Sequence, residues 1–172
     1  MNIIFLDIDG VLNSYLYFKT LDKEQNAERY TEISDYHLKW LAKIYNTCNA
    51  QIVLSSTWRE LDDPTNDECM AMWKYLVDSL AKYGMSIYGK TPYIDVNRPK
   101  EILAWLEARS DKDSINYVIL DDDFQPEQYA AYGLEKHLVK TEFWSDSVDT
   151  GGLQAKHVKK AIQILSGTQG TL

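Results

Sequence analysis

The sequence has few of the residues that form disulfide bonds or bind zinc in small proteins. Only two of its 172 residues are cysteines, Cys48 and Cys69. Two cysteines suit neither a disulfide framework nor a zinc cluster, so we interpret both as small packed residues in a reducing compartment. The three histidines (His37, His137 and His157) show no spacing that suggests a ligand set. We expect surface or packing roles for them.

Long apolar runs and a surplus of positive charge are also missing. No run approaches the ~20 apolar residues that span a bilayer, and no basic segment leads into an apolar stretch of signal length. Lys and Arg number 18 against 26 Asp and Glu, which leaves a formal net charge of -8. That charge disfavours binding of nucleic acid through the overall electrostatic field of the protein. A polyanionic partner must therefore be bound at a small local site. We expect a cytoplasmic protein with no membrane partner.

What is present is enough apolar material for one folded domain. Hydrophobic residues make up 45% of the chain, and we predict a domain over residues 1–166 with a flexible tail at 167–172. Apolar runs predict strands at 3–6, 51–54, 85–88, 117–120 and 137–139. Helical spacing and capping residues predict helices near 34–48, 64–83, 99–109, 126–132 and 153–165. Residues 13–33 show no clean period and are expected to form an irregular excursion or small flap.

Strands that alternate with helices imply an α/β fold. We predict a Rossmann-like three-layer sandwich with a central parallel sheet of about five strands. In such sheets ligands bind beyond the carboxyl ends of the strands. Three of the predicted strands run into polar residues there: Asp7 and Asp9, Ser55 and Ser56, and Asp121 and Asp122. Their convergence at one edge is the central expectation.

The first of these strand ends, in IIFLDIDGVLNS (residues 3–14), concentrates like charge. Asp7 and Asp9 are two residues apart, so both side chains of a strand would project to the same face. At ~6 Å and an effective dielectric of ~20 their repulsion is roughly 3 kcal/mol. Either a divalent cation or a raised pKa on one carboxyl group would offset it, and both mark functional sites.

Carboxylates from two strand ends favour Mg²⁺, for which Asp7, Asp9, Asp121 and Asp122 are the candidate ligands. An aspartate beside such an ion can attack phosphorus, and Asp7 is the candidate nucleophile. A carboxyl group two residues on is placed to act as general acid and base, so this role is assigned to Asp9.

Residues that follow could hold the phosphate. Gly10 has no side chain, so its backbone could approach a phosphate closely. Ser55 and Ser56 could bind a phosphoryl oxygen, and either Arg98 or Lys100 at a helix start could stabilise its charge.

At this point the residues resemble the haloacid dehalogenase-like (HAD) phosphohydrolases, from Ile3 to about Leu165. The most specific part is D-x-D-G-V-L at Asp7 to Leu12. The resemblance implies the same roles for Asp7 and Asp9, a phosphate-binding Ser55, and a Mg²⁺ site closed by Asp121 with Asp122. For the cation of its third motif it offers Arg98 or Lys100, with Lys90 a weaker third candidate. The second aspartate indicates a phosphatase, because HAD dehalogenases lack it and the ion-pumping ATPases replace it with Thr. No large insertion is expected, so the cap should be minimal.

A narrower similarity rests on VLSSTWR (53–59), NRPKEILAWL (97–106), YVILDDD (117–123) and the Gly-Gly-Leu before the last helix. These look like the small HAD domains of nucleic-acid repair proteins, relatives of polynucleotide 3′-phosphatases. The implied substrate is a phosphorylated small molecule, a nucleotide or a nucleic-acid end. Trp58 and Trp144 follow strand ends, where they could stack on a base.

The sequence thus predicts a Mg²⁺-dependent phosphomonoesterase that works through an aspartyl-phosphate. Phosphoryl transfer to an acceptor other than water is a second enzymatic reading. From a different class, the alternative is a catalytically silent phosphate-binding or partner-recognition domain with the same fold.

Overall fold

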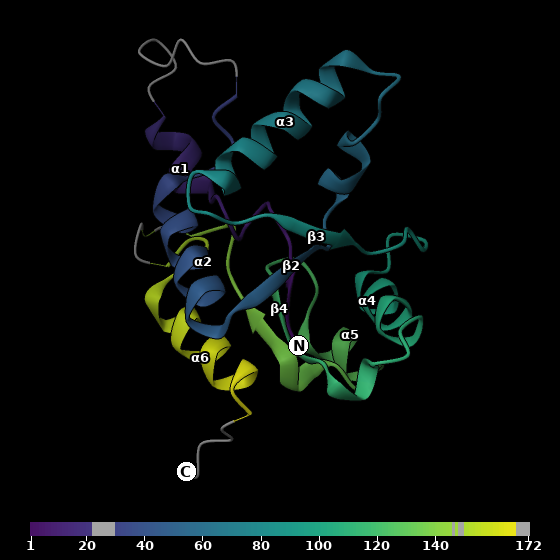
Figure 1. Ribbon diagram of the computed structural model, residues 1–172. Coiled ribbons are helices and arrows are strands. Elements are labelled where there is room, and N and C mark those ends of the chain that lie inside the picture. Colours follow the sequence, from purple (N-terminus) through teal and green to yellow (C-terminus); the bar gives the residue numbers. More distant parts are fainter. Residues whose placement is uncertain (22–29, 146, 148–149, 168–172) are drawn as a thin grey trace.

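A parallel sheet of five strands forms the centre of the molecule in the computed structural model, which describes residues 1–21, 30–145, 147 and 150–167 (Figure 1). The strands are β1 (Asn2–Leu6), β2 (Ala50–Leu54), β3 (Ile87–Lys90), β4 (Asn116–Asp121) and β5 (Leu138–Lys140). Their order is β3-β2-β1-β4-β5, with every neighbouring pair parallel. The predicted α/β sandwich is confirmed.

Helices cover both faces of this sheet. They are α1 (Tyr15–Thr20), α2 (Asp35–Cys48), α3 (Asp67–Ala81), α4 (Arg98–Glu107), α5 (Pro126–Ala130) and α6 (Ala155–Leu165). Short 3₁₀ turns occupy η1 (Thr57–Leu61), η2 (Lys112–Ser114) and η3 (Glu135–His137). Side chains alternate along β1, so Ile4 and Leu6 pack with α2, α3 and α6, whereas Ile3 and Phe5 pack with α4 and α5. Figure 1 shows α2 and α6 on one side of the sheet and α4 and α5 on the other.

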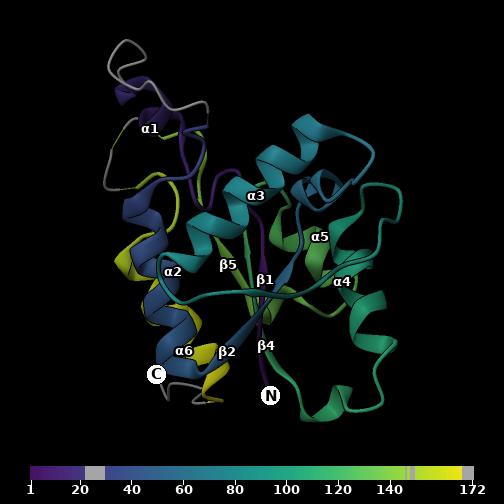
Figure 2. The same ribbon diagram turned by 45° about the horizontal axis from the view of Figure 1, so that its top comes forward.

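Register aligns the strand ends that carry the polar residues. Leu6 of β1 pairs with Leu54 of β2 and Leu120 of β4, which brings the next residue of each strand to one level. The Asp7 amide donates to the Leu120 carbonyl at 3.0 Å, and the Ser55 amide donates to the Leu6 carbonyl at 2.8 Å. Helix α1 lies beyond this carboxyl edge, at the end of the sheet away from the N-terminus (Figure 2).

At two of the predicted boundaries that are wrong, helix-end chemistry overrides the apolar pattern. Helix α3 begins at Asp67 instead of Pro64, since the Asn66 side chain accepts from the amides of Glu68 and Cys69. Strand β3 begins at Ile87 instead of Met85, since the Met85 amide donates back to the Leu80 carbonyl and closes the turn through Gly84 (φ +71°). Strand β5 begins one residue later than predicted, and helix α6 begins two residues later.

The irregular excursion predicted over residues 13–33 is wrong in part, because Tyr15–Thr20 form a helix capped by the Ser14 side chain. Residues 22–29 and most of the predicted tail, 168–172, lie outside the described residues. Among the helices of the described ranges, none combines the length and apolar character needed to cross a bilayer.

Candidate active site

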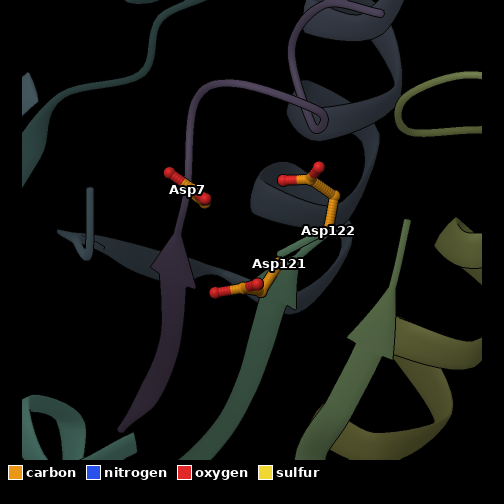
Figure 3. Close-up of side chains that lie close together, drawn as sticks. All are labelled: Asp7, Asp121 and Asp122. Carbon is orange, nitrogen blue, oxygen red and sulfur yellow. The ribbon is translucent and has the colours of Figure 1, made fainter. Parts of the chain in front are cut away.

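Three carboxylates meet at the carboxyl edge of the sheet. Asp7 follows β1, Asp121 ends β4, and Asp122 comes directly after it (Figure 3). One carboxylate oxygen from each of the three lies within 4.8 Å of the others. Asp7 and Asp121 are buried, and Asp122 is half-buried. The predicted convergence of β1 and β4 carboxylates is therefore present, and Asp123 is outside the group.

Burial makes negative charge costly in this acid group. Desolvation raises the pKa of Asp7 to about 7, an effect that the Arg98 guanidinium opposes and the Asp121 carboxylate reinforces. Desolvation and the Asp121 charge likewise raise the pKa of Asp122 to about 6, against the attraction of Lys140. The site thus holds more acidic groups than its own cations balance.

Arg98 is the cation that the fold brings into the acid group. It is the first residue of α4, where Asn97 caps the helix by accepting from the Lys100 amide at 3.1 Å. The Arg98 Nη1 donates to Asp7 Oδ2 and, at 3.0 Å, to Asp121 Oδ2. Burial disfavours the charged guanidinium, but the Asp7 and Asp121 carboxylates outweigh this and raise the pKa of Arg98.

The two other candidate cations are placed differently. Lys100 is exposed on α4 and does not line the cavity beside the acids. Lys90 pairs with Asp62 and lies over the Trp73 ring, 4.3 Å from its centroid. Of the three predicted candidates, Arg98 is the one whose guanidinium contacts the acid group.

Asp121 is fixed by donors to both of its oxygens. Its Oδ1 accepts from the backbone amides of Asp123 and Phe124, at 2.8 and 3.0 Å. Its Oδ2 accepts from the Tyr129 hydroxyl at 2.9 Å in addition to Arg98. Tyr129 is not predicted from the sequence, because its only signal is its place in the short helix that follows the aspartates.

Asp9 lies outside the three-carboxylate group and is exposed. Its Oδ2 accepts from the Trp58 indole Nε1 at 2.9 Å, and its Oδ1 accepts from the Asn13 amide Nδ2 at 2.8 Å. Trp58 is itself buried, so it holds Asp9 and has no free face for stacking on a base. The placement of the Asp9 side chain suits proton transfer at the mouth of the site better than metal ligation.

Gly10 is required for a reason other than phosphate approach. Its φ is +69°, and a Cβ atom there would lie 2.0 Å from Cγ of Asp122. Its amide donates to Asn13 Oδ1 at 2.8 Å. Glycine therefore makes room for the Asp122 carboxylate, while its N–H group is used within the loop.

Ser55 and Ser56 differ in their hydrogen bonding. The Ser55 hydroxyl is buried and has no hydrogen-bond partner among the described residues. Ser56 hydrogen-bonds the Asp7 carboxyl group and also accepts from the Trp58 amide, where it caps η1. A buried hydroxyl without a partner costs free energy, and a ligand oxygen could supply its bond.

A buried ion pair that the sequence did not indicate holds α4 against η1. Arg59 Nη2 donates to Glu101 Oε1 at 3.0 Å, and both side chains are buried. The same Glu101 oxygen accepts from the Ile94 amide at 2.9 Å. This contact fixes the loop that leads into α4 and so sets the position of Arg98.

A cavity of about 340 Å³ opens over the acid group. Asp7, Asp9, Arg98, Asp122 and Asp123 line it together with Phe18, Thr57, Val96, Phe124, Phe143 and Trp144. The ligand atoms at its acidic end are all carboxylate oxygens, without histidine or cysteine in the described group. Such a donor set fits Mg²⁺, and a divalent cation would stabilise the carboxylates whose pKa values burial and, less strongly, the Asp121 charge raise.

Comparison with known proteins supports the same family. Residues 3–157 match the family described as the HAD domain in Swiss Army Knife RNA repair proteins. Searches of curated proteins and of solved structures returned no significant match. The match includes β1 from Ile3 onward, all of β4 and each residue of the acid group. The chain therefore belongs to the HAD domain family of Swiss Army Knife RNA repair proteins.

Proposed function

We propose that this protein is a Mg²⁺-dependent phosphomonoesterase that works through an aspartyl-phosphate at Asp7. The observation that carries the proposal is the meeting of Asp7, Asp121 and Asp122 within 4.8 Å at one edge of the sheet. Asp9 stands beside them at the mouth of the same cavity. A silent binding domain would have no need for a second, separately oriented carboxylate there.

In the first step the Asp7 carboxylate attacks the phosphorus atom. A bond forms from the Asp7 oxygen to phosphorus as the bond from phosphorus to the substrate oxygen breaks. Asp9 donates its proton to the leaving oxygen, which departs as an alcohol. Arg98, which contacts Asp7, and the Ser55 hydroxyl, which has no partner among the described residues, are the groups that would donate hydrogen bonds to phosphoryl oxygens.

In the second step water cleaves the aspartyl-phosphate. Asp9, now ionised, accepts a proton from the water as its oxygen attacks phosphorus. The bond between phosphorus and the Asp7 oxygen breaks, inorganic phosphate leaves, and Asp7 is regenerated. The hydrogen bonds from Trp58 and Asn13 keep the Asp9 carboxylate in one place through both proton transfers.

Asp7, Asp121 and Asp122 would hold the Mg²⁺ ion. When bound, the ion offsets the charge of the acid group and of the phosphoryl oxygens, which favours attack by one anion on another. Arg98 contributes positive charge from the protein itself, shared between Asp7 and Asp121.

The substrate we propose is a phosphate at a nucleotide or polynucleotide end. The family description names RNA repair proteins, which supports a nucleic-acid substrate. The cavity is open at the surface, and exposed Trp144 and Val96 stand at its edge, so a bulky group can extend beyond the acids.

The experiment is phosphate release from a panel of mononucleotides and of oligonucleotides with 3′- or 5′-phosphates, with Mg²⁺ or with EDTA. We expect Mg²⁺-dependent release that falls about 10³-fold or more in Asp7→Asn, because the nucleophile is lost. Asp113→Asn, an exposed change in η2 before β4, should keep full activity. No release from any phosphomonoester would contradict the proposal and favour a silent phosphate-binding domain.

A further inference from the structure

Four aromatic side chains form a surface beside the acidic end of the cavity. They come from two distant segments: Tyr15 and Phe18 from α1, and Phe143 and Trp144 from the segment after β5. We call these four residues the aromatic rim. Trp144 is 77% exposed, more than any other large hydrophobic side chain in the described ranges. Exposing an indole to water is unfavourable, and the mechanism above makes no use of it.

The rings of the aromatic rim pack on one another. The centroid of Trp144 lies 5.0 Å from that of Tyr15 and 5.0 Å from that of Phe143. Phe18 joins through Phe143, with centroids 6.2 Å apart. Ring contacts at these separations are favourable, so the four side chains hold one another in place and form one continuous surface.

Backbone hydrogen bonds tie the rim to the acid group. The Tyr15 amide donates to the Phe143 carbonyl at 3.0 Å, which joins the two segments. Just before Phe143, the Thr141 amide donates to the Asp121 carbonyl at 3.0 Å, so the segment that leads from β5 to the rim is hydrogen-bonded to the end of β4. Phe18, Phe143 and Trp144 then line the same cavity as Asp7 and Asp9.

We propose that the aromatic rim binds the nucleobase next to the scissile phosphate, by stacking, so that the preferred substrate is an unpaired phosphorylated end. The inference rests on the proposed function and concerns the nucleobase, the part of the substrate that the acid group does not contact. A phosphate at Asp7 places the rest of the ligand toward Phe18, Phe143 and Trp144, and flat rings are the usual platform for unpaired bases.

The negative charge of the protein favours stacking on the bases over binding to the phosphate backbone. The chain carries a formal net charge of -8, and the cavity itself contributes four aspartates. Such a surface repels the phosphates of a long strand, so affinity beyond the terminal phosphate must come from uncharged contacts. A terminal base in a duplex is held by its pairing partner and by the base pair beneath it, whereas an unpaired base is free to turn onto the rings, which is why an unpaired end is expected.

The test compares trinucleotides that differ only at the phosphorylated terminal residue, which carries either adenine or no base. Binding is measured by calorimetry to the Asp7→Asn protein with Mg²⁺, for both 3′- and 5′-phosphorylated ligands. For the preferred end, the abasic ligand should bind about 10-fold more weakly or worse, since stacking on one aromatic ring is lost. Adding Trp144→Ala should weaken the adenine ligand about 10-fold and leave the abasic ligand within about twofold.

Two further variants separate stacking from general damage. Trp144→Phe should retain most of the difference between the ligands, and Tyr88→Ala, an exposed tyrosine on β3, should change neither affinity. Equal binding of the two ligands, an equal loss for both in Trp144→Ala, or no binding at all would overturn the inference. Because the variant used is inactive, the result is independent of turnover: failed hydrolysis refutes the proposed function alone, and equal affinities refute the rim alone.

Discussion

Asp9 is oriented by two N–H groups, one on each carboxylate oxygen. The Trp58 indole binds Oδ2 and the Asn13 amide binds Oδ1, so the exposed carboxylate is held without being buried. Asn13 also accepts from the Gly10 amide, which links the position of Asp9 to the turn that admits Asp122. A general acid needs such placement because proton transfer depends steeply on distance and direction.

Removing the indole N–H should therefore impair catalysis more than binding. We expect Trp58→Phe, which keeps the buried ring, to lower kcat about 10- to 100-fold with little change in KM, because Asp9 loses one of its two anchors. Trp73→Phe, a half-buried change on α3, is the matched control and should behave as wild type. Steady-state kinetics on the best substrate of the panel measure both constants. Wild-type kcat in Trp58→Phe would show that the Trp58 contact does not position the acid.

At the residue scale, the sequence predicts the site residues that lie together in one short motif. It does not predict those that come together only through tertiary contacts. Asp7 and Asp9 stand out because two charges interrupt an apolar strand end. Tyr129 carries no sign of its role in the sequence, and Trp58 suggests stacking on a base, because the contacts of both residues with the aspartates form only in the tertiary fold. Lys100 and Arg98 cannot be told apart until the start of α4 is known, because two residues on a helix turn the side chain to another face.

Helix α6 begins with a capping box in which histidine takes the place of glutamate or glutamine. The Gln154 amide donates to Nδ1 of His157 at 3.0 Å. Burial lowers the pKa of His157 from 6.5 to about 4, with further lowering from Lys156, Lys160 and His37. The cap therefore needs the neutral imidazole, because a protonated Nδ1 cannot accept the bond.

This helix cap should make stability depend on pH in a defined direction. The unfolded His157 takes up a proton near pH 6.5 and the folded one only near pH 4, so stability is full above about pH 6.5 and falls as the pH drops toward 4. His157→Gln keeps an acceptor at the same capping position but does not titrate. Between pH 7 and pH 4.5 the variant should lose less free energy of unfolding than wild type, by on the order of 2 kcal/mol.

Urea unfolding at the two pH values measures this difference. If the variant loses as much stability as the wild type between them, His157 is not the titrating group and this account of the cap is wrong.

At the scale of elements, strands and helices with strong apolar periods are predictable and their edges are not. The runs that form β1, β2 and β4 lie within a residue of their predicted bounds because both faces of each are buried. Helix α1 was missed because none of its residues is buried, so its sequence carries no apolar stripe. Its cap at Ser14 was the available signal.

The whole molecule gathers its chemistry at one edge because β1 is central. With β2 on one side and β4 on the other, the residues after these strands meet where parallel strands end. Helix α4, packed on one face, adds Arg98 from its first turn. Acids on the central strands and one buried guanidinium form a site that a divalent cation would complete.

The alternation of strands and helices made this sheet edge predictable, but it could not predict the aromatic rim. Parallel topology fixes where strand ends meet, whatever the loops do. The aromatic rim depends on the contact between α1 and residues 143–144, which are more than a hundred residues apart and show no shared pattern. Loop contacts of this kind follow from the tertiary fold alone.

The central claim is that carboxylates from β1 and β4 share one divalent cation. The most direct measurement is anomalous diffraction from crystals soaked with Mn²⁺ as a substitute for Mg²⁺. The account predicts a peak in contact with oxygens of Asp7 and of the Asp121–Asp122 pair. Crystals in which Mn²⁺ binds only elsewhere, or leaves these carboxylates without a peak, would contradict it.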